Sequence, residues 1–315
     1  MTMRWRAALA GSLATIAFAA MSSAASAQPI KMPFDTRPML PENSARRISP
    51  HAYVIMGFPN VGIVVGKTGT LVIDTGLGAR NGALVAAEAR KLSARGARLY
   101  LTTTHFHPEH ASGQGGFPAG TVVIRPTVQQ AELERDGPGM LSLFARLSPE
   151  MKTHLDGAVV GKADVLFDRD HRLDLGGVHV RLDWYGHAHT EGDELVMVDE
   201  DSLMFTGDVV QDRISPNFTC EACSPRRWIA VLDGLAPLKP RQVAPDHGVL
   251  GDGSLIGKER AFLVDLRDRA AALKQQGKSA DEAGKIIQAE FEARHPEWGG
   301  LNNIPGSVKH AYTNP

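Results

Sequence analysis

The chain has 315 residues, of which 43% are hydrophobic, 34 are basic and 35 are acidic, and its formal net charge is −1. This length and hydrophobic content suffice for one large domain or for two small ones. The sequence contains no basic tract and no stripe of interleaved basic and aromatic residues, which argues against nucleic acid as the partner.

The first 27 residues have the pattern of a secretory signal peptide. Arg4 and Arg6 form a positive start, an apolar run extends from Ala7 to Met21, and Ala25-Ser26-Ala27 provides a small-residue cleavage site. A membrane anchor is the alternative, but the apolar run is too short for a comfortable span. Cleavage near Ala27 removes two of the 34 basic residues and no acidic one, which leaves 32 basic and 35 acidic residues. We expect a periplasmic or secreted protein without stable membrane association.

Residues 28–50 contain several prolines and little periodicity, which is typical of an N-terminal arm. Regular structure is expected from His51 onwards. The strands expected in the first half are residues 51–57, 61–66, 70–73, 99–103 and 121–124. The expected helices are residues 81–95 and 126–147, the second with a break at Gly137-Pro138-Gly139. This order predicts a layered α/β domain.

The second half begins with more β structure and ends in helices. Strands are expected at residues 163–167, 171–175, 178–184, 194–198, 202–205 and 241–244. Helices are expected at residues 226–235, 254–276 and 279–294. The tail from Pro296 contains prolines, glycines and aromatic residues and is expected to pack as a loop. The sequence therefore predicts a catalytic domain at residues 51–295 and a C-terminal tail at residues 296–315.

One short segment, from His105 to His110, is rich in metal-ligand residues. It carries three histidines and Glu109, and it directly follows the expected strand 99–103. Neutral imidazoles and carboxylates are ligands of hydrolytic zinc sites, and ligands of α/β sheets gather beyond the carboxyl ends of strands. His105 and His107 can face one ion from an extended turn, whereas Glu109 and His110 would face a second. For this segment alone, a polar loop that happens to contain histidines is the alternative.

Four further residues of this kind also follow expected strands. They are Asp74, His189, Asp208 and His247. A single Asp or His at a strand end is usually a helix cap or a hydrogen-bonded polar group, but this ordered series is a specific pattern. Over roughly residues 51–250, the chain resembles the metallo-β-lactamase-fold hydrolase superfamily. The resemblance implies a four-layer αββα sandwich, with two mixed sheets face to face and a metal site along one rim.

The resemblance also implies roles for the residues of this pattern. The ligands of a first zinc ion would be His105, His107 and His189, those of a second would be Glu109, His110 and His247, and Asp208 would bridge both ions. Asp74 would hold a ligand histidine from behind. His187 is the rival of His189. We assign the ligand to His189 because it lies in a His-Thr-x-Gly-Asp motif, and we expect His187 to support it.

Glu109 departs from the family pattern, which usually has Asp at this position. The family's Asp binds the second metal ion and orients the attacking water. A Glu side chain adds one methylene, so its carboxylate reaches about one ångström further and has one more rotatable bond to fix. The second ion could be shifted or lost, or Glu109 could act as a base alone. Either one or two zinc ions per chain is therefore compatible with the sequence.

The site residues favour a zinc-dependent hydrolase. Zinc can lower the pKa of water from about 15.7 towards neutrality, so that a hydroxide attacks a carbonyl or phosphoryl centre, and it stabilises the oxyanion that results. Glu109, as a proton donor to the leaving group, and Asp208 are the candidate catalytic residues. A serine triad is the weaker hypothesis because no Gly-x-Ser-x-Gly motif occurs. A periplasmic metal carrier with a closed site, and an interaction module that has lost its chemistry, are the alternatives.

The substrate is not specified by these residues, because loops decide it in this fold. A small carbonyl ester or amide is favoured over a phosphodiester, because no cluster of Lys and Arg lies beside the ligand loops. We expect a cyclic amide or ester that carries a carboxylate, so a β-lactam is the first expectation and a lactone the second. One of Arg213, Arg226 and Arg227 could bind a substrate carboxylate. The alternative for each arginine is a helix cap or a solvent-facing position.

The only two cysteines, Cys220 and Cys223, are separated by two residues. This spacing occurs in zinc knuckles and in redox pairs, but no further ligands are nearby and the segment is a proline-flanked connection. In an oxidising compartment a disulfide is favoured. Because it closes a short loop, we expect it to stabilise this segment only modestly.

Overall fold

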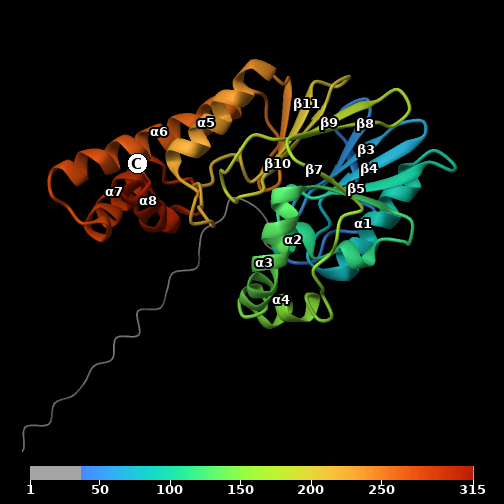
Figure 1. Cartoon of the computed structure of the whole chain (residues 1–315), viewed down its shortest axis with the longest axis horizontal. Helices are drawn as coiled ribbons and strands as arrows, with labels where there is room; N and C mark the ends of the chain where they lie inside the picture. The colour runs from blue at the N-terminus through green and yellow to red at the C-terminus, as the bar shows by residue number, and fades with distance from the viewer. Residues whose placement is uncertain (1–36, 315) are drawn as a thin grey trace, which may run out of the picture.

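The computed structural model of the chain describes residues 37–314. The expected signal peptide and the first part of the expected arm lie outside the described residues. Figure 1 shows two β-sheets at the centre of the molecule, with helices on both sides of them. None of the helices in the described range is both long and apolar enough to cross a membrane.

The first sheet has seven strands that lie side by side in sequence order. Strands β1 to β4 pair antiparallel, and β4 to β7 pair in parallel. The strands are β1 (Arg46–Arg47), β2 (Ala52–Ile55), β3 (Val61–Val65), β4 (Gly69–Ile73), β5 (Arg98–Thr102), β6 (Val122–Pro126) and β7 (Val165–Phe167). Regular structure therefore begins before His51, because the short strand β1 inside the expected arm pairs with β2.

The second sheet has five strands in the order β12-β11-β10-β9-β8. Its neighbours pair antiparallel, except for β11 and β12, which pair in parallel. The strands are β8 (Asp170–Asp174), β9 (His179–Trp184), β10 (Glu194–Val198), β11 (Leu203–Gly207) and β12 (Gln242–Pro245). Apart from β1, each described strand lies where the hydrophobic pattern predicts one.

The central strands of each sheet, such as β4 and β10, bury both of their faces, and alternate residues face different layers. In β4, Leu71 and Ile73 lie in the core between the two sheets, whereas Val72 packs on the outer side of the first sheet. In β10, Val196 lies in the core between the sheets, and Leu195 packs on the outer side of the second sheet. Each sheet therefore needs a cover on its outer face.

Helices provide these covers and complete the expected αββα sandwich. Helix α1 (Gly78–Leu92) packs on the outer face of the first sheet through Val85 and Ala89. Helices α5 (Pro225–Leu235) and α6 (Ser254–Gln275) pack on the outer face of the second sheet. Figure 1 shows α3 (Thr127–Phe144) and α4 (Pro149–His154) in green, beside one end of the sheets.

The break expected at Pro138 is wrong, because α3 runs through this residue. A proline inside a helix leaves the carbonyl four residues earlier, here that of Glu134, without its N–H partner. Both Pro138 and Glu134 are exposed, so water can hydrogen-bond to this carbonyl. The helix therefore tolerates the proline and carries its C-terminal half over the rim of the sandwich.

The loop expected for the C-terminal tail is also wrong. Helix α8 (Ile304–Thr313) follows α7 (Ala280–Arg294) and contacts it. Pro305 falls at the start of α8, where its missing N–H costs nothing. Ile304, Val308 and Ala311 recur at helical spacing and are buried in the same hydrophobic cluster as α5 and α6. The tail thus belongs to the helical layer behind the second sheet.

Candidate metal centre

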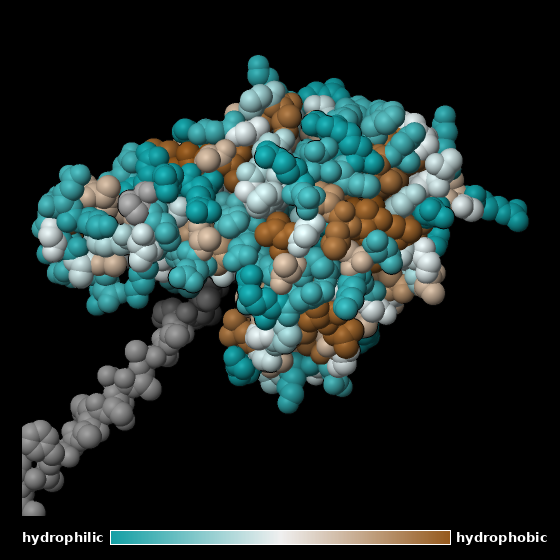
Figure 2. Space-filling view, in the orientation of Figure 1, coloured by the Kyte–Doolittle hydropathy of each residue, from teal (hydrophilic) through white to brown (hydrophobic). Residues whose placement is uncertain are grey.

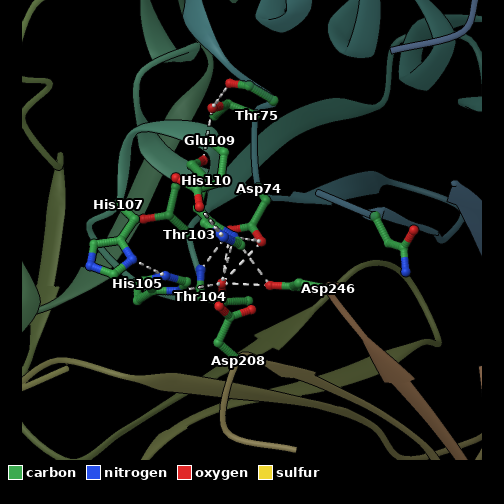
Figure 3. Close-up of polar contacts among 12 residues, drawn as sticks. Asp74, Thr75, Thr103, Thr104, His105, His107, Glu109, His110, Asp208 and Asp246 are labelled. Carbon is green, nitrogen blue, oxygen red and sulfur yellow. Dashed lines mark hydrogen bonds and ion pairs between the residues drawn. The ribbon is translucent and has the colours of Figure 1, made fainter. Parts of the chain in front are cut away.

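Five strand ends meet at one rim of the sandwich and bring the expected site residues together. Asp74 follows β4, and the segment His105–His110, which includes the short helix α2 (Pro108–Ala111), follows β5. Asp208 and His247 come directly after β11 and shortly after β12, and His189 lies in the loop after β9. Figure 3 shows side chains from the loops after β4, β5, β11 and β12 converging.

The first group at this rim consists of His105, His107 and His189. One ring nitrogen from each lies within 4.8 Å of the others. The Nδ1 atom of His107 is 3.0 Å from Nε2 of His105 and 3.3 Å from Nε2 of His189. Burial, reinforced by the neighbouring imidazoles, holds the pKa values of His105 and His107 well below the usual value. These two imidazoles are therefore neutral at pH 7, as a metal ligand must be.

The second group consists of Glu109, His110 and His247, whose ligand atoms also lie within 4.8 Å of one another. Asp208 stands between the two groups, because its carboxylate oxygens lie 3.6 Å from Nε2 of His189 and 3.5 Å from Nε2 of His247. Burial alone would raise the pKa of Asp208, but the surrounding histidines outweigh it and lower the pKa to about 2. Asp208 is therefore an ionised carboxylate shared by both groups.

The donor atoms of this cluster fit a metal cation. Buried polar atoms normally have a hydrogen-bond partner, and leaving one without a partner costs about 1–3 kcal/mol. In the described part of the chain, His107 Nε2, His110 Nε2, Glu109 Oε2 and Asp208 Oδ1 are buried and lack such a partner. Imidazole nitrogens and carboxylate oxygens in this number suit Zn²⁺ or a similar divalent ion.

Asp74 contacts His110, as expected of a residue that holds a ligand from behind. Its carboxylate lies 3.0 Å from Nδ1 of His110 and accepts a hydrogen bond of 2.7 Å from the backbone N–H of Thr104. Asp74 adopts a left-handed backbone conformation, with φ of 71°. The carboxylate on Nδ1 leaves the opposite nitrogen of His110 facing Glu109 and the cluster.

Asp246 is a supporting residue that our sequence reasoning missed. Its carboxyl group accepts a hydrogen bond of 2.7 Å from the Thr104 hydroxyl and lies 3.3 Å from Nδ1 of His110 (Figure 3). Burial and the nearby charge of Asp74 raise the pKa of Asp246 well above the usual value. Asp246 also forms a ligand-like group with His105 and His110. Because it already serves Thr104 and His110, we interpret it as a support. Its place at a strand end, as for Asp74, was the available signal.

The neighbour of His189 does not act as the expected support. His187 is half-buried, with Nδ1 3.4 Å from a guanidinium nitrogen of Arg227 and its ring beside Trp184. Instead, Nδ1 of His189 donates a hydrogen bond of 2.5 Å to the carbonyl of Asn217. The support for His189 therefore comes from a backbone oxygen, which carries no signature in the sequence.

The segment that supplies Asn217 is tied down on both sides. The backbone N–H of Thr219 donates to the carbonyl of His189 at 3.0 Å, and a disulfide joins Cys220 to Cys223 directly afterwards. The carbonyl of Cys223 accepts a hydrogen bond of 2.9 Å from His310 of α8. The disulfide and the C-terminal helix thus brace the loop that positions His189.

Helix α3 links the two histidine-bearing loops. The amide nitrogen of Gln129 donates to the carbonyl of Thr103, before the first loop, at 2.8 Å, and to that of Gly192, in the second loop, at 2.9 Å. The carboxyl group of Glu132 accepts hydrogen bonds of 3.0 Å from the backbone N–H groups of Glu191 and Gly192. A Cβ on Gly192 would lie 2.4 Å from the Cα of Gln129, so only glycine fits there. No sequence motif indicates this link.

A pocket of about 260 Å³ opens onto the cluster. It is lined by Phe58, His107, Glu109, Met140, Leu143, Phe144, His189, Asp208, Gln211, Ile214, Ser215, Pro216, Asn217, Thr219, His247 and Asn303. Asn303 comes from the tail that was expected to be a loop. Residues of both ligand groups thus face a space that can admit a small molecule.

None of the arginines that were considered for binding a substrate carboxylate lines this pocket. Among its described lining residues none is Lys or Arg. Arg213 pairs with Asp212, and its side chain is 47% exposed. Arg226 is exposed, and Arg227 lines a different depression beside α8. Closeness in sequence to Asp208 did not decide the direction of the arginine side chain: Gln211 and Ile214 line the pocket, but the side chain of Arg213 between them pairs with Asp212 instead.

The link through Gln129 gives a first prediction. Replacing Gln129 with Ala removes the bonds to both loops, so we expect metal affinity to fall about 10- to 100-fold, as is typical when a support of metal ligands is lost. Competition with a chromogenic chelator measures this affinity. Gln288→Ala, at a partly exposed glutamine of α7 whose side chain donates to Glu292, is the control and should leave affinity unchanged. Equal affinities in Gln129→Ala and the parent protein would contradict the role assigned to Gln129.

The ionisation of the histidines gives a second prediction. Because burial lowers the pKa values of His105 and His107, both stay neutral at a pH at which an ordinary histidine would be protonated. Burial lowers the pKa of His110, but Asp74 and Asp246 outweigh it and raise the pKa well above the usual value. A metal ion at the second group must therefore displace a proton from His110, which becomes harder as the pH falls. We expect the second group to release its ion first when the pH is lowered from about 8 to about 5.

Metal content after dialysis at stepped pH checks this order. The variant His105→Ala lacks a ligand of the first group and should hold metal only at the second group. It should therefore lose this metal at the higher of the two pH values at which the parent protein releases its ions. Simultaneous loss of both ions from the parent protein would refute the difference between the groups.

Comparison with known proteins agrees with this geometry. The sequence profile of the metallo-beta-lactamase superfamily matches residues 54–247. No curated protein matches the chain. A metallo-beta-lactamase from Pontibacter korlensis is 20% identical, with a TM-score of 0.56, and the match covers 70% of this chain and 98% of that one. DIM-1 metallo-beta-lactamase is 16% identical, with a TM-score of 0.56, and the match covers 72% of this chain and 99% of that one.

A second kind of similar structure is the stereoselective inverting sec-alkylsulfatase Pisa1 from Pseudomonas sp. It is 16% identical, with a TM-score of 0.63, and the match covers 85% of this chain and 50% of that one. At these identities the likeness concerns the fold. The match of the sequence profile together with the converging histidines and carboxylates establishes the family. The chain belongs to the metallo-beta-lactamase superfamily and is a metal-dependent hydrolase.

Proposed function

We propose that the protein is an exported zinc hydrolase that cleaves a small carbonyl ester or amide of the lactone or β-lactam type. The observation that carries this proposal is the position of Asp208, an ionised carboxylate between two ligand groups that open onto one pocket. A reacting carbonyl in this pocket would lie beside both groups. The disulfide supports export, because such bonds persist in oxidising compartments.

We assign the ligands as the family pattern implies. The first zinc ion would be held by His105, His107 and His189, the second by Glu109, His110 and His247, with Asp208 contacting both. Bound zinc would supply an activated water and stabilise the oxyanion of the transition state. Asp74 and Asp246 fix the orientation of His110 before any ion binds.

Glu109 has two chemical options in this site. Burial, opposed by His110, raises its pKa to about 7. Where the second zinc is bound, Glu109 would be an ionised ligand. Where it is absent, the carboxyl group can hold a proton near neutral pH and pass it to the leaving group. In either state its position beside the pocket places it within the reacting region.

Turnover is favoured over metal storage, because a carrier is expected to close its site, whereas these ligands border an open pocket. A phosphodiester is a weaker candidate substrate. Its anionic group would find no Lys or Arg among the described residues that line the pocket and would depend on the metal ions alone. A carbonyl group needs only one oxyanion to be stabilised.

A substrate panel tests the proposed reaction. We expect the zinc-loaded mature protein to hydrolyse a lactone, an aryl ester or a chromogenic cephalosporin, to lose this activity on chelation, and to regain it with zinc. The variant His189→Ala should lose one metal ion and at least about 100-fold in kcat/KM, because it removes a ligand. The control His187→Ala changes the histidine that faces Arg227 and should keep both metal and activity.

Two results would overturn the assignment. Full activity after exhaustive chelation would exclude a metal-dependent reaction. A preference for an aryl phosphodiester by more than about tenfold in kcat/KM, equivalent to about 1.4 kcal/mol of transition-state binding, would exclude a carbonyl substrate.

Glu109 gives a separate prediction about metal content. Because its side chain is longer and more mobile than Asp, we expect the isolated protein to hold fewer than two equivalents of zinc. Glu109→Asp should raise zinc content towards two equivalents, measured by elemental analysis after dialysis. Two tightly held ions in both proteins would remove support for a weakened second site.

A further inference from the structure

The pocket over the metal cluster has an apolar wall that ester or amide hydrolysis does not itself require. Met140, Leu143 and Phe144, in the last turns of α3, line one side of it. The ring of Phe144 lies 6.5 Å from that of His107, which belongs to the first ligand group. The wall is therefore directly beside the position of the reacting carbonyl.

The opposite side of the cluster is apolar as well. The ring of Phe58 lies 5.1 Å from that of His247, in the second ligand group. Aromatic side chains thus flank both ligand groups, and Ile214 and Pro216 add further apolar surface to the pocket. A substrate at the metal centre would be enclosed by hydrocarbon on two sides.

The end of α3 also leaves a large apolar side chain in contact with solvent. Leu143 is 44% exposed although it lines the pocket. Figure 2 shows apolar side chains gathered on the surface over α3 and α4. Exposed leucines are common, but one that continues the wall of a ligand pocket offers apolar area that a substrate can cover.

The side chains that line the pocket disfavour a substrate with a carboxylate and favour an uncharged one. Glu109 and Asp208 are the only carboxylates among its described lining residues, and both belong to the metal cluster. The remaining polar groups, such as Gln211 and Asn217, are uncharged. A substrate carboxylate would lose favourable hydration here without gaining an arginine or lysine partner. An apolar chain has no such hydration to lose.

We propose that the substrate is an uncharged ester or lactone whose apolar acyl chain lies against Met140, Leu143 and Phe144. This inference rests on the proposed carbonyl hydrolysis and adds the class of substrate, in place of the carboxylate-bearing substrate expected from the sequence. Hydrolysis breaks the bond between the acyl carbon and the ester oxygen. Water gives its hydroxyl to the acyl carbon and a proton to the departing oxygen, which yields an acid and an alcohol.

The test uses zinc-loaded protein and p-nitrophenyl esters that share a leaving group. From acetate to butyrate to hexanoate, we expect kcat/KM to rise about 2- to 4-fold for each CH₂, because each methylene moves from water to the apolar wall. The p-nitrophenyl monoester of glutaric acid should react at least about tenfold more slowly than the valerate ester, since its terminal carboxylate lacks a partner.

Leu143→Lys places a cation on the wall and keeps the ligands intact. It should lower the hexanoate-to-acetate ratio of kcat/KM and raise the glutarate-to-valerate ratio. Leu147→Lys is the matched control: Leu147 is 60% exposed and does not line the pocket, so both ratios should stay unchanged. Because both leucines are exposed, neither substitution disturbs the core.

The possible failures are distinguishable. Absence of zinc-dependent hydrolysis of these esters, of the lactone and of the chromogenic cephalosporin would overturn the proposed function. Zinc-dependent hydrolysis of the cephalosporin alone would overturn only the inferred substrate class. Zinc-dependent hydrolysis with no dependence on chain length, or with a preference for the glutarate ester, would overturn only the inferred substrate class. If Leu143→Lys and Leu147→Lys changed these two ratios equally, the end of α3 would not be the surface that contacts the acyl chain.

Discussion

The contact between Asp74 and His110 joins the end of β4 to the histidine loop after β5, and the metal centre depends on it. The same carboxylate accepts a hydrogen bond from the backbone of Thr104, so one side chain fixes both the start of the loop and the direction of its last histidine. Asp246, which follows β12 of the second sheet, contacts the same loop: it accepts a hydrogen bond from the Thr104 hydroxyl and lies beside His110. Because all these groups are buried, each needs a partner, and this need sets how the two sheets meet at the rim.

The chemistry of the site follows from the balance of charge at this rim. Burial keeps His105 and His107 neutral, and the surrounding histidines keep Asp208 ionised, so the cluster offers lone pairs and negative charge to a cation. Helix α3 then acts at both of its ends. Gln129 holds the ligand loops together, and the last turns form one wall of the pocket. The geometry of the metal centre and the shape of the substrate pocket are therefore coupled through α3.

Three sequence expectations failed for related physical reasons. Proline was taken as a helix breaker at Pro138 and as a sign of a loop around Pro305. One lies on an exposed face, where water can replace the lost bond, and the other lies at a helix start. Arg213 was one of three arginines considered for binding a substrate carboxylate because it follows Asp208 closely, but it pairs with Asp212 and is 47% exposed, in line with the solvent-facing alternative. For Pro138 and Arg213 the outcome depended on exposure to solvent, which a local pattern does not report, and for Pro305 it depended on where the helix begins.

The sequence by itself determined the strands of both sheets, apart from β1, and the grouping of the histidines after β5. Strands can be predicted from local sequence, because a run of apolar residues between turns must be buried. The histidine group is also local, because His105 to His110 are neighbours along the chain. Only the tertiary structure decided that Asp246, Gln129 and the carbonyl of Asn217 hold the ligand loops, and that the end of α3 lines the pocket. These contacts join residues far apart in the sequence, and no local periodicity or motif records them, because their geometry arises when the two sheets and α3 pack together.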